Sequence, residues 1–102
     1  MIIMYKRKDE DLIREFLDSI DPKTIEDTIE CESLSGDEWI QIIVLASGLI
    51  STNVVRFLVQ YIKSKRIIIK DNNGIIIEAR NADDAIKIIK ALDEKEKSEM
   101  KN

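Results

Sequence analysis

The sequence predicts a small α+β fold, in which a sheet carries helices on one face, and a ferredoxin-like arrangement is our first expectation. Three observations favour it: short apolar runs bounded by charges, two isoleucine triplets that flank an Asn-Gly turn, and apolar residues at helical spacing between these runs. The chain of 102 residues has the length of one domain with one modest core. We expect the domain to span residues 1–93 and a charged tail, 94–102, to fray.

The N-terminal segment predicts a strand followed by a helix. Residues 1–7 form a short apolar run that ends in cations and suits a first strand. Residues 9–20 place apolar side chains at helical spacing, and the acidic residues at their start lie where the helix dipole favours negative charge. The pair Asp21-Pro22 ends this helix, because the residue before a proline is disfavoured in the helical region.

Residues 23–33 are compatible with a strand or a helix. Ile25, Ile29 and Cys31 fall on odd positions and alternate with polar residues, as in a half-exposed strand. The Asp-Pro pair before them would also suit the start of a helix. We favour a strand, centred on residues 28–33.

The clearest helix start lies in the middle of the chain. Ser35 and Glu38 are spaced as a capping box, and Leu34 and Trp39 are spaced as the hydrophobic staple that often accompanies one. The segment then continues to about residue 64 without a proline, so a long helical stretch is expected.

One helix over residues 36–64 would overhang the sheet, since a helix rises about 1.5 Å per residue and strands are short. Gly48 and the polar residues 51–53 favour a break. We therefore expect either two helices, over about 36–48 and 53–64, or one long helix that projects toward a partner.

Residues 66–79 predict a β-hairpin. A three-residue loop, 72–74, sets Ile69 opposite Ile77 and places Gly74 at the left-handed position of a type I turn with a bulge. Because a one-residue slip inverts every side chain, the register that separates polar from apolar residues is favoured. One face of the hairpin then supplies core residues: Ile67, Ile69, Ile75, Ile77 and Ala79.

The second face of this hairpin carries two isoleucines among charges. Ile68 and Ile76 lie between Arg66, Lys70 and Arg80 in the favoured register. The isoleucines are either β-formers shielded by the stems of the cationic side chains or the anchors of a docking surface. We retain these five residues as candidate interaction residues.

Asn81 is expected to cap a last helix. Apolar residues recur at helical spacing in that helix as far as Leu92. The residues after Leu92 have no apolar face, which is why a frayed tail is predicted.

The apolar segment 39–62 contains small residues and polar interruptions. Ala46 and Gly48 would let another element approach closely, either at an internal crossing or at a homodimer seam, and both are candidate interaction residues. A membrane span is not expected, because the longest apolar run, residues 42–50, is far shorter than the ~20 residues that a span needs.

The residue inventory argues against catalysis. The chain has no His and one Cys, Cys31, so the commonest general base and the usual zinc ligands are missing. Its three glycines form no phosphate-binding loop. We therefore expect no enzyme, no cofactor and no metal site. The single cysteine favours a reducing compartment, and a cytoplasmic location is expected.

The charge pattern bears on nucleic acid as a partner. A net charge of −4 gives no global support for binding a polyanion. A local group of cations is either helix C-terminal charge with a solvated edge, or a site for acidic partners or phosphate. This group comprises Lys63, Lys65, Arg66, Lys70 and Arg80.

The segment FLVQYIKSKRIIIKDNNGIIIEARNADDAIKIIKAL, residues 57–92, carries a resemblance to a known family. A helix end with an aromatic residue runs into a basic pair, an alternating strand, an Asn-Gly turn, a second strand and an Ala-containing helix. Over residues 39–92 this pattern resembles the effector-associated constant component family, small α+β modules found beside peptidase and NTPase effectors in microbial conflict systems. The resemblance implies an adaptor without catalysis of its own, and it assigns no functional residue.

The leading functional prediction is a non-enzymatic protein-interaction or adaptor module, whose partner is another protein or a second copy in a homodimer. The alternative is a small mobile-element protein, viral or phage, that inhibits a host defence or binds nucleic acid through the local basic group. Nucleic acid is the less favoured partner, and salt-dependent binding would favour it over docking.

Overall fold

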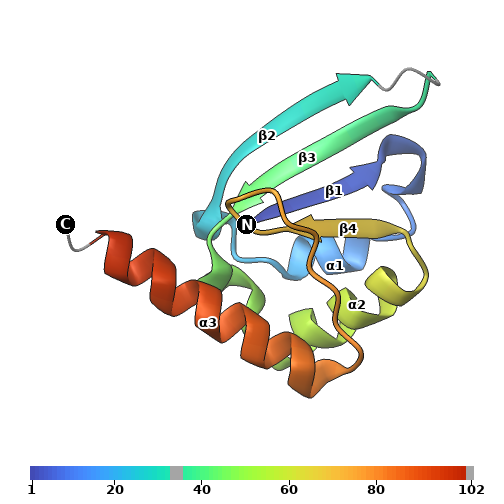
Figure 1. Ribbon diagram of the computed structural model, residues 1–102. Helices are drawn as coiled ribbons and strands as arrows, with labels where there is room; N and C mark the ends of the chain where they lie inside the picture. The colour runs from blue at the N-terminus through green and yellow to red at the C-terminus, as the bar shows by residue number, and fades with distance from the viewer. Residues whose placement is uncertain (33–35, 101–102) are drawn as a thin grey trace.

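A computed structural model describes residues 1–32 and 36–100, and in this part of the chain a four-stranded antiparallel sheet has its helices on one side (Figure 1). The strands are β1 (Ile2–Lys6), β2 (Ile25–Glu32), β3 (Glu38–Val44) and β4 (Ile67–Lys70). The helices are α1 (Arg14–Ser19), α2 (Thr52–Lys63) and α3 (Ala82–Met100), with short 3₁₀ turns η1 (Arg7–Asp9), η2 (Pro22–Thr24) and η3 (Ala46–Leu49).

The connectivity confirms the predicted ferredoxin-like arrangement. The strands lie in the order β2-β3-β1-β4, and every neighbouring pair is antiparallel. Along the chain the elements run β1-α1-β2-β3-α2-β4, so two strand-helix-strand units are split and interleaved in one sheet. Helix α3 follows as an addition and contacts both α2 and η3.

The core lies between the sheet and the helices. Alternate residues of β1, β3 and β4 are buried and point toward the helices, as the period of two along a strand requires. This inner face of the sheet is formed by Ile3, Tyr5, Ile40, Ile42, Val44, Ile67 and Ile69, all of which are at most 7% exposed. The helices bury Phe16, Leu58 and Ile89, among others, in the same core.

The largest departure from the sequence prediction is at residues 38–44. The expected helix over 36–48 is wrong, because this segment is the central strand β3, paired with β1 on one side and β2 on the other. Glu38 opens a strand, and the proposed capping residues Leu34 and Ser35 lie outside the described residues. Two flanking strands satisfy the backbone of β3 along its length, which outweighs a local helix-start signal.

The predicted break in the apolar segment is confirmed, and the single long helix is wrong. Helix α2 covers Thr52–Lys63, close to the expected 53–64, and the Ser51 hydroxyl accepts a hydrogen bond of 3.4 Å from the Val54 amide at its start. Before it, η3 packs Gly48 so tightly that a Cβ there would overlap the side chain of Thr24.

The expected strand near residues 28–33 is confirmed as β2, but its side chains are not arranged as predicted. The register against β3 shifts between Ile25 and Asp27, which makes a bulge. Ile25 consequently pairs with Val44 of the inner face, whereas Ile29 and Cys31 lie on the opposite face. The three odd-numbered apolar residues therefore do not share one face.

The register of the predicted hairpin is confirmed, although its second half forms only one bridge. Lys70 pairs with Ile76, and the Ile77 amide donates a hydrogen bond of 2.8 Å to the Ile69 carbonyl, so the loop is the expected 72–74. Gly74 has φ +82°, as the bulged turn requires. Ile75 was expected in the core but is 63% exposed, because no regular strand continues there.

The sequence predicts a helix near the N-terminus and another after Asn81, and the structure contains both, as α1 and α3. Helix α1 begins at Arg14, later than the predicted residue 9, because Arg7–Asp9 forms a 3₁₀ turn instead. Asn81 caps α3, and its side-chain oxygen accepts a hydrogen bond of 2.9 Å from the Asp84 amide.

The tail predicted to fray from residue 94 is helical as far as Met100. Glu96 explains why the helix continues. Its carboxylate accepts a hydrogen bond of 2.9 Å from the Ala46 amide and lies 3.6 Å from the amino group of Met1. These two contacts attach the polar end of α3 to β1 and η3.

No helix among the described residues combines the length and the apolar character that crossing a membrane requires.

Candidate interaction surface

The candidate functional site is the face of the sheet that points away from the helices, which we call the outer face. Strand register determines its side chains, because directly opposed residues share a face. They form three rows across β2, β3, β1 and β4. The first row is Asp27, Ile43, Ile2 and Lys70; the second is Ile29, Gln41, Met4 and Ile68; the third is Cys31, Trp39 and Lys6.

The outer face carries a cluster of apolar side chains on β3, β1 and β4, with Gln41 beside it in the middle row. Ile2, Met4, Ile43 and Ile68 are neighbours across the strands, and each is half-buried although no helix covers this side of the sheet (Figure 1). Ile29 at the β2 edge is 40% exposed. A solvated face of an antiparallel sheet is commonly polar, so this composition indicates a surface suited to a partner.

The hairpin extends this surface beyond β4. Because Ile76 bridges to Lys70, both residues lie on the same side as Ile68. Ile76 is 56% exposed, which makes it one of the most exposed large apolar side chains of the described residues. The structure therefore brings three of the predicted interaction residues together at one margin of the outer face.

The two predicted arginines have contacts of their own. One terminal nitrogen of Arg66 lies 3.5 Å from Asp9. Arg80 lies just before α3, where its backbone amide donates a hydrogen bond of 3.2 Å to the Asp84 carboxylate. Their part in a ring of cations around Ile68 stays a prediction.

Ala46 and Gly48, also predicted as interaction residues, are not on the surface. Both are buried in η3, where Ala46 is held by Glu96 and Gly48 packs on Thr24. Of the two alternatives for this small-residue patch, the structure shows the internal crossing. A homodimer seam at these residues is wrong, because another chain could not reach them.

Trp39 marks the third row of the outer face. The Lys6 ammonium lies 5.6 Å from the centre of the Trp39 ring and 3.5 Å from Asp37. Beside the ring, the Gln41 amide nitrogen is 3.6 Å from the Cys31 sulfur. This end of the face is therefore mixed in polarity, with an aromatic ring next to a cation.

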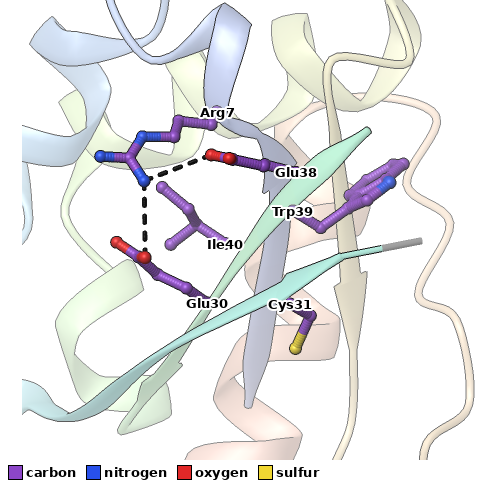
Figure 2. Close-up of a pocket in the computed structure, with 6 residues that line it drawn as sticks. All are labelled: Arg7, Glu30, Cys31, Glu38, Trp39 and Ile40. Carbon is purple, nitrogen blue, oxygen red and sulfur yellow. Dashed lines mark hydrogen bonds and ion pairs between the residues drawn. The ribbon is translucent and has the colours of Figure 1, made fainter. Parts of the chain in front are cut away.

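A hollow on the other side of the same strands holds paired charges. Arg7 lies 3.4 Å from Glu30 and 3.3 Å from Glu38, above Ile40 (Figure 2). In Figure 2 the side chains of Trp39 and Cys31 point away from this ion-pair group. All three charged groups are largely exposed, so each ion pair contributes about 0–1 kcal/mol to the stability of the fold. The Arg7 guanidinium is paired with two carboxylates.

The turn between α2 and β4 holds the remaining cations of the predicted basic group. Lys65 has φ +60°, a left-handed conformation that favours glycine. The Arg66 amide donates to the Tyr61 carbonyl and the Lys65 amide to the Ile62 carbonyl, the hydrogen bonds of a Schellman motif. Together with Lys6 at the end of β1 and Lys8 of η1, these two cations line a shallow hollow around Asp9.

Tyr5 is the described side chain whose acidity is clearly altered. Burial, reinforced by the nearby Glu10 carboxylate, raises the pKa of Tyr5 to about 12. A phenol with so high a pKa stays protonated at neutral pH, so it cannot act as a base there.

Sequence reasoning found Ile68, Ile76 and Lys70 but missed Ile2, Met4 and Ile43 as surface residues. The first three lie in one hairpin, whose two halves are adjacent in the sequence. The other three meet only through the β1–β3 pairing, between segments about forty residues apart. The alternation of Trp39, Gln41 and Ile43 with buried residues was the signal that could have revealed the outward side of β3.

Comparisons with known proteins assign no family to this chain: it matches no family model, no curated protein and no solved structure.

Proposed function

We propose that the chain is a non-enzymatic protein-interaction module that docks through the outer face of its sheet. The observation that carries this proposal is the cluster of Ile2, Met4, Ile43 and Ile68 on a face of the four-stranded sheet that no helix covers (Figure 1). A sheet of two-layer architecture buries one face against its helices, and apolar side chains on the other face gain free energy by being covered.

The resemblance of residues 39–92 to the effector-associated constant component family supports the same class of function, an adaptor without its own catalysis. The sequence contains no histidine, so the commonest general base is missing. Both observations support an interaction module over an enzyme.

Nucleic acid binding is the competing proposal, for a small mobile-element protein that acts on a host. The hollow formed by Lys6, Lys8, Lys65 and Arg66 favours it, because these four cations line it together with one carboxylate, Asp9, and the Trp39 ring, although Lys6 also pairs with Asp37. Four-stranded sheets that bind RNA stack bases on aromatic residues. On the described outer face Trp39 is the single aromatic side chain, and the net charge of the chain is −4. These observations favour protein docking.

The test is a pull-down that compares two charged variants. The protein carries its tag at the C-terminus, because the amino group of Met1 is buried against Val44. The docking variant is Ile68→Glu with Ile76→Glu. The control is Ile75→Glu, which places one of these two charges on the residue next to Ile76, at a position that is 63% exposed.

Wild-type and variant proteins are expressed in the native host, treated with nuclease and washed at two salt concentrations. We expect a stoichiometric protein that survives high salt, is retained by Ile75→Glu and is lost by the double variant. Equal retention by both variants would contradict docking at the outer face. Nucleic acid that leaves with salt, without a protein, would favour the competing proposal.

A further inference from the structure

We propose that a second copy of this chain covers the outer face, with the two sheets packed face to face about a two-fold axis parallel to the strands and midway between β3 and β1. This inference rests on the proposed function of the outer face and names its occupant. The order of side chains along each row of the outer face is complementary to itself, and this order points to a second copy.

A two-fold axis of this direction keeps each row at its own height and reverses its order in the partner. The β2 edge of one copy then faces the β4 edge of the other, and β3 faces β1. A row is therefore complementary to itself if, after its order is reversed, apolar side chains face apolar ones and each charge faces an opposite charge.

The first row meets this condition. It runs Asp27, Ile43, Ile2, Lys70, which is acid, isoleucine, isoleucine, base. In the dimer Asp27 faces the partner's Lys70, and Ile43 faces the partner's Ile2. Symmetry repeats both contacts, so two opposite-charge pairs close the interface at opposite corners.

The second and third rows agree with the first. In the second row Ile29 faces the partner's Ile68, and Gln41 faces the partner's Met4. In the third row Trp39 faces the partner's Lys6. The Trp39 ring already has Lys6 of its own chain beside it, so the dimer gives it a second cation.

Other arrangements of two copies are less favourable. An axis perpendicular to the strands would exchange the first and third rows and place Lys6 on the partner's Ile2, a cation against an aliphatic side chain. Pairing the free β2 edges would bring together Asp27 and Glu30 of both copies, with like charges side by side.

The dimensions predict a small interface. Three rows about 6.8 Å apart and four strands about 4.8 Å apart cover roughly 15 × 20 Å on each copy, about 600 Å² in total, which is below the ~1,200 Å² of standard specific interfaces and predicts a weak dimer. Packed sheets are rotated by about 30° relative to each other, so the strands of each copy lie about 15° from the two-fold axis, and a corner about 10 Å from the centre of the interface is displaced by roughly 5 Å. The long side chain of Lys70 spans that offset and still reaches the partner's Asp27.

The experiment uses two charge-reversal variants, Asp27→Lys and Lys70→Asp. Each alone places like charges at both corners of its homodimer, and we expect its dissociation constant to rise at least tenfold. Mixing the two variants restores opposite charges at both corners, so a heterodimer of wild-type affinity should form. Sedimentation velocity from about 10 µM to 1 mM, a range suited to a weak interface, measures association of each variant alone and of their mixture. Circular dichroism checks that each variant is folded.

Gln41→Leu provides a test by gain of affinity, which a folding defect cannot imitate. The substitution removes a polar group that faces the partner's Met4, so we expect a dissociation constant at least threefold lower. An unchanged constant would place Gln41 outside the interface and overturn the proposed axis.

The outcomes separate this inference from the proposed function. Dimerisation that neither reversal weakens would overturn the two-fold arrangement. A wild-type chain that stays monomeric to about 1 mM would overturn the second copy as occupant; if the pull-down partner is then lost by the Ile68→Glu, Ile76→Glu variant, the proposed function stands. If every outer-face variant keeps the protein partner and still dimerises, both the proposed function and the dimer are overturned.

Discussion

The two faces of the sheet are built from the same strands and largely from the same residue types, but the helices cover only one of them (Figure 1). Ile3 on the inner face is fully buried, whereas its neighbour Ile2 on the outer face is half-buried. Ile42 and Ile43 on β3 repeat this contrast. Chemistry alone therefore does not tell which isoleucines hold the fold. Their position relative to the helices decides it.

Alanine substitutions at the neighbouring pair Ile3 and Ile2 should show the largest difference. Ile3→Ala leaves a cavity in the core and should lower the free energy of unfolding by about 2–5 kcal/mol. Ile2→Ala should cost about 1 kcal/mol, because Ile2 is only partly covered. Urea unfolding of both variants measures the difference. Ile3→Val, which should cost about 0.5–1.5 kcal/mol, replaces Ile3→Ala if the latter does not fold.

A smaller effect concerns the one tyrosine of the inner face, Tyr5. Its pKa is about 12 when folded and 10 when unfolded, so the unfolded state ionises first as the pH rises. The stability is therefore complete below pH 10 and is lost between about pH 10 and 12, by roughly 2 kcal/mol. In Tyr5→Phe this alkaline loss should be absent. Urea unfolding at a series of pH values compares the two proteins. Lysines also lose their charge near pH 10, but both proteins have the same lysines, so their effect cancels in the comparison. Parallel pH profiles would contradict the burial of the phenol.

The smallest effect lies in the turn that joins α2 to β4 at the margin between the two faces. Lys65 has a left-handed backbone, so Lys65→Gly should raise the free energy of unfolding by about 0.5–1 kcal/mol. Lys63→Gly, inside the last turn of α2, is the matched control and should lower it by a similar amount. Thermal unfolding gives both signs. If both variants are destabilised, the side-chain contacts of Lys65 stabilise the fold by more than its left-handed backbone costs.

Much of the inner layer could be predicted from the sequence, since its helices and its hairpin have local signals. The Asn81 cap and the left-handed Gly74 lie within a few residues of the elements that they define. The loop register followed from separating polar from apolar side chains, which is also a local property.

The strand β3 and the full outer face could not be predicted in this way. Ser35 and Glu38 have the spacing of a helix start, but residues 38–44 have a period of two and two flanking strands, β1 and β2, that complete their hydrogen bonds. Similarly, the bulge that sends Ile25 inward depends on its pairing with Val44. Such features arise from partners distant in the sequence, which local patterns do not specify.

The isoleucine methyl groups offer the most direct measurement, because isoleucines occupy both faces. Methyl NMR spectra are recorded at low and high protein concentration, and again with any partner that the pull-down isolates. We expect changes in the signals of Ile2, Ile29, Ile43 and Ile68, while those of Ile3 and Ile42 stay unchanged. Changes confined to the helical side, or at the exposed control position Ile75 alone, would contradict the assignment of the outer face as the docking surface.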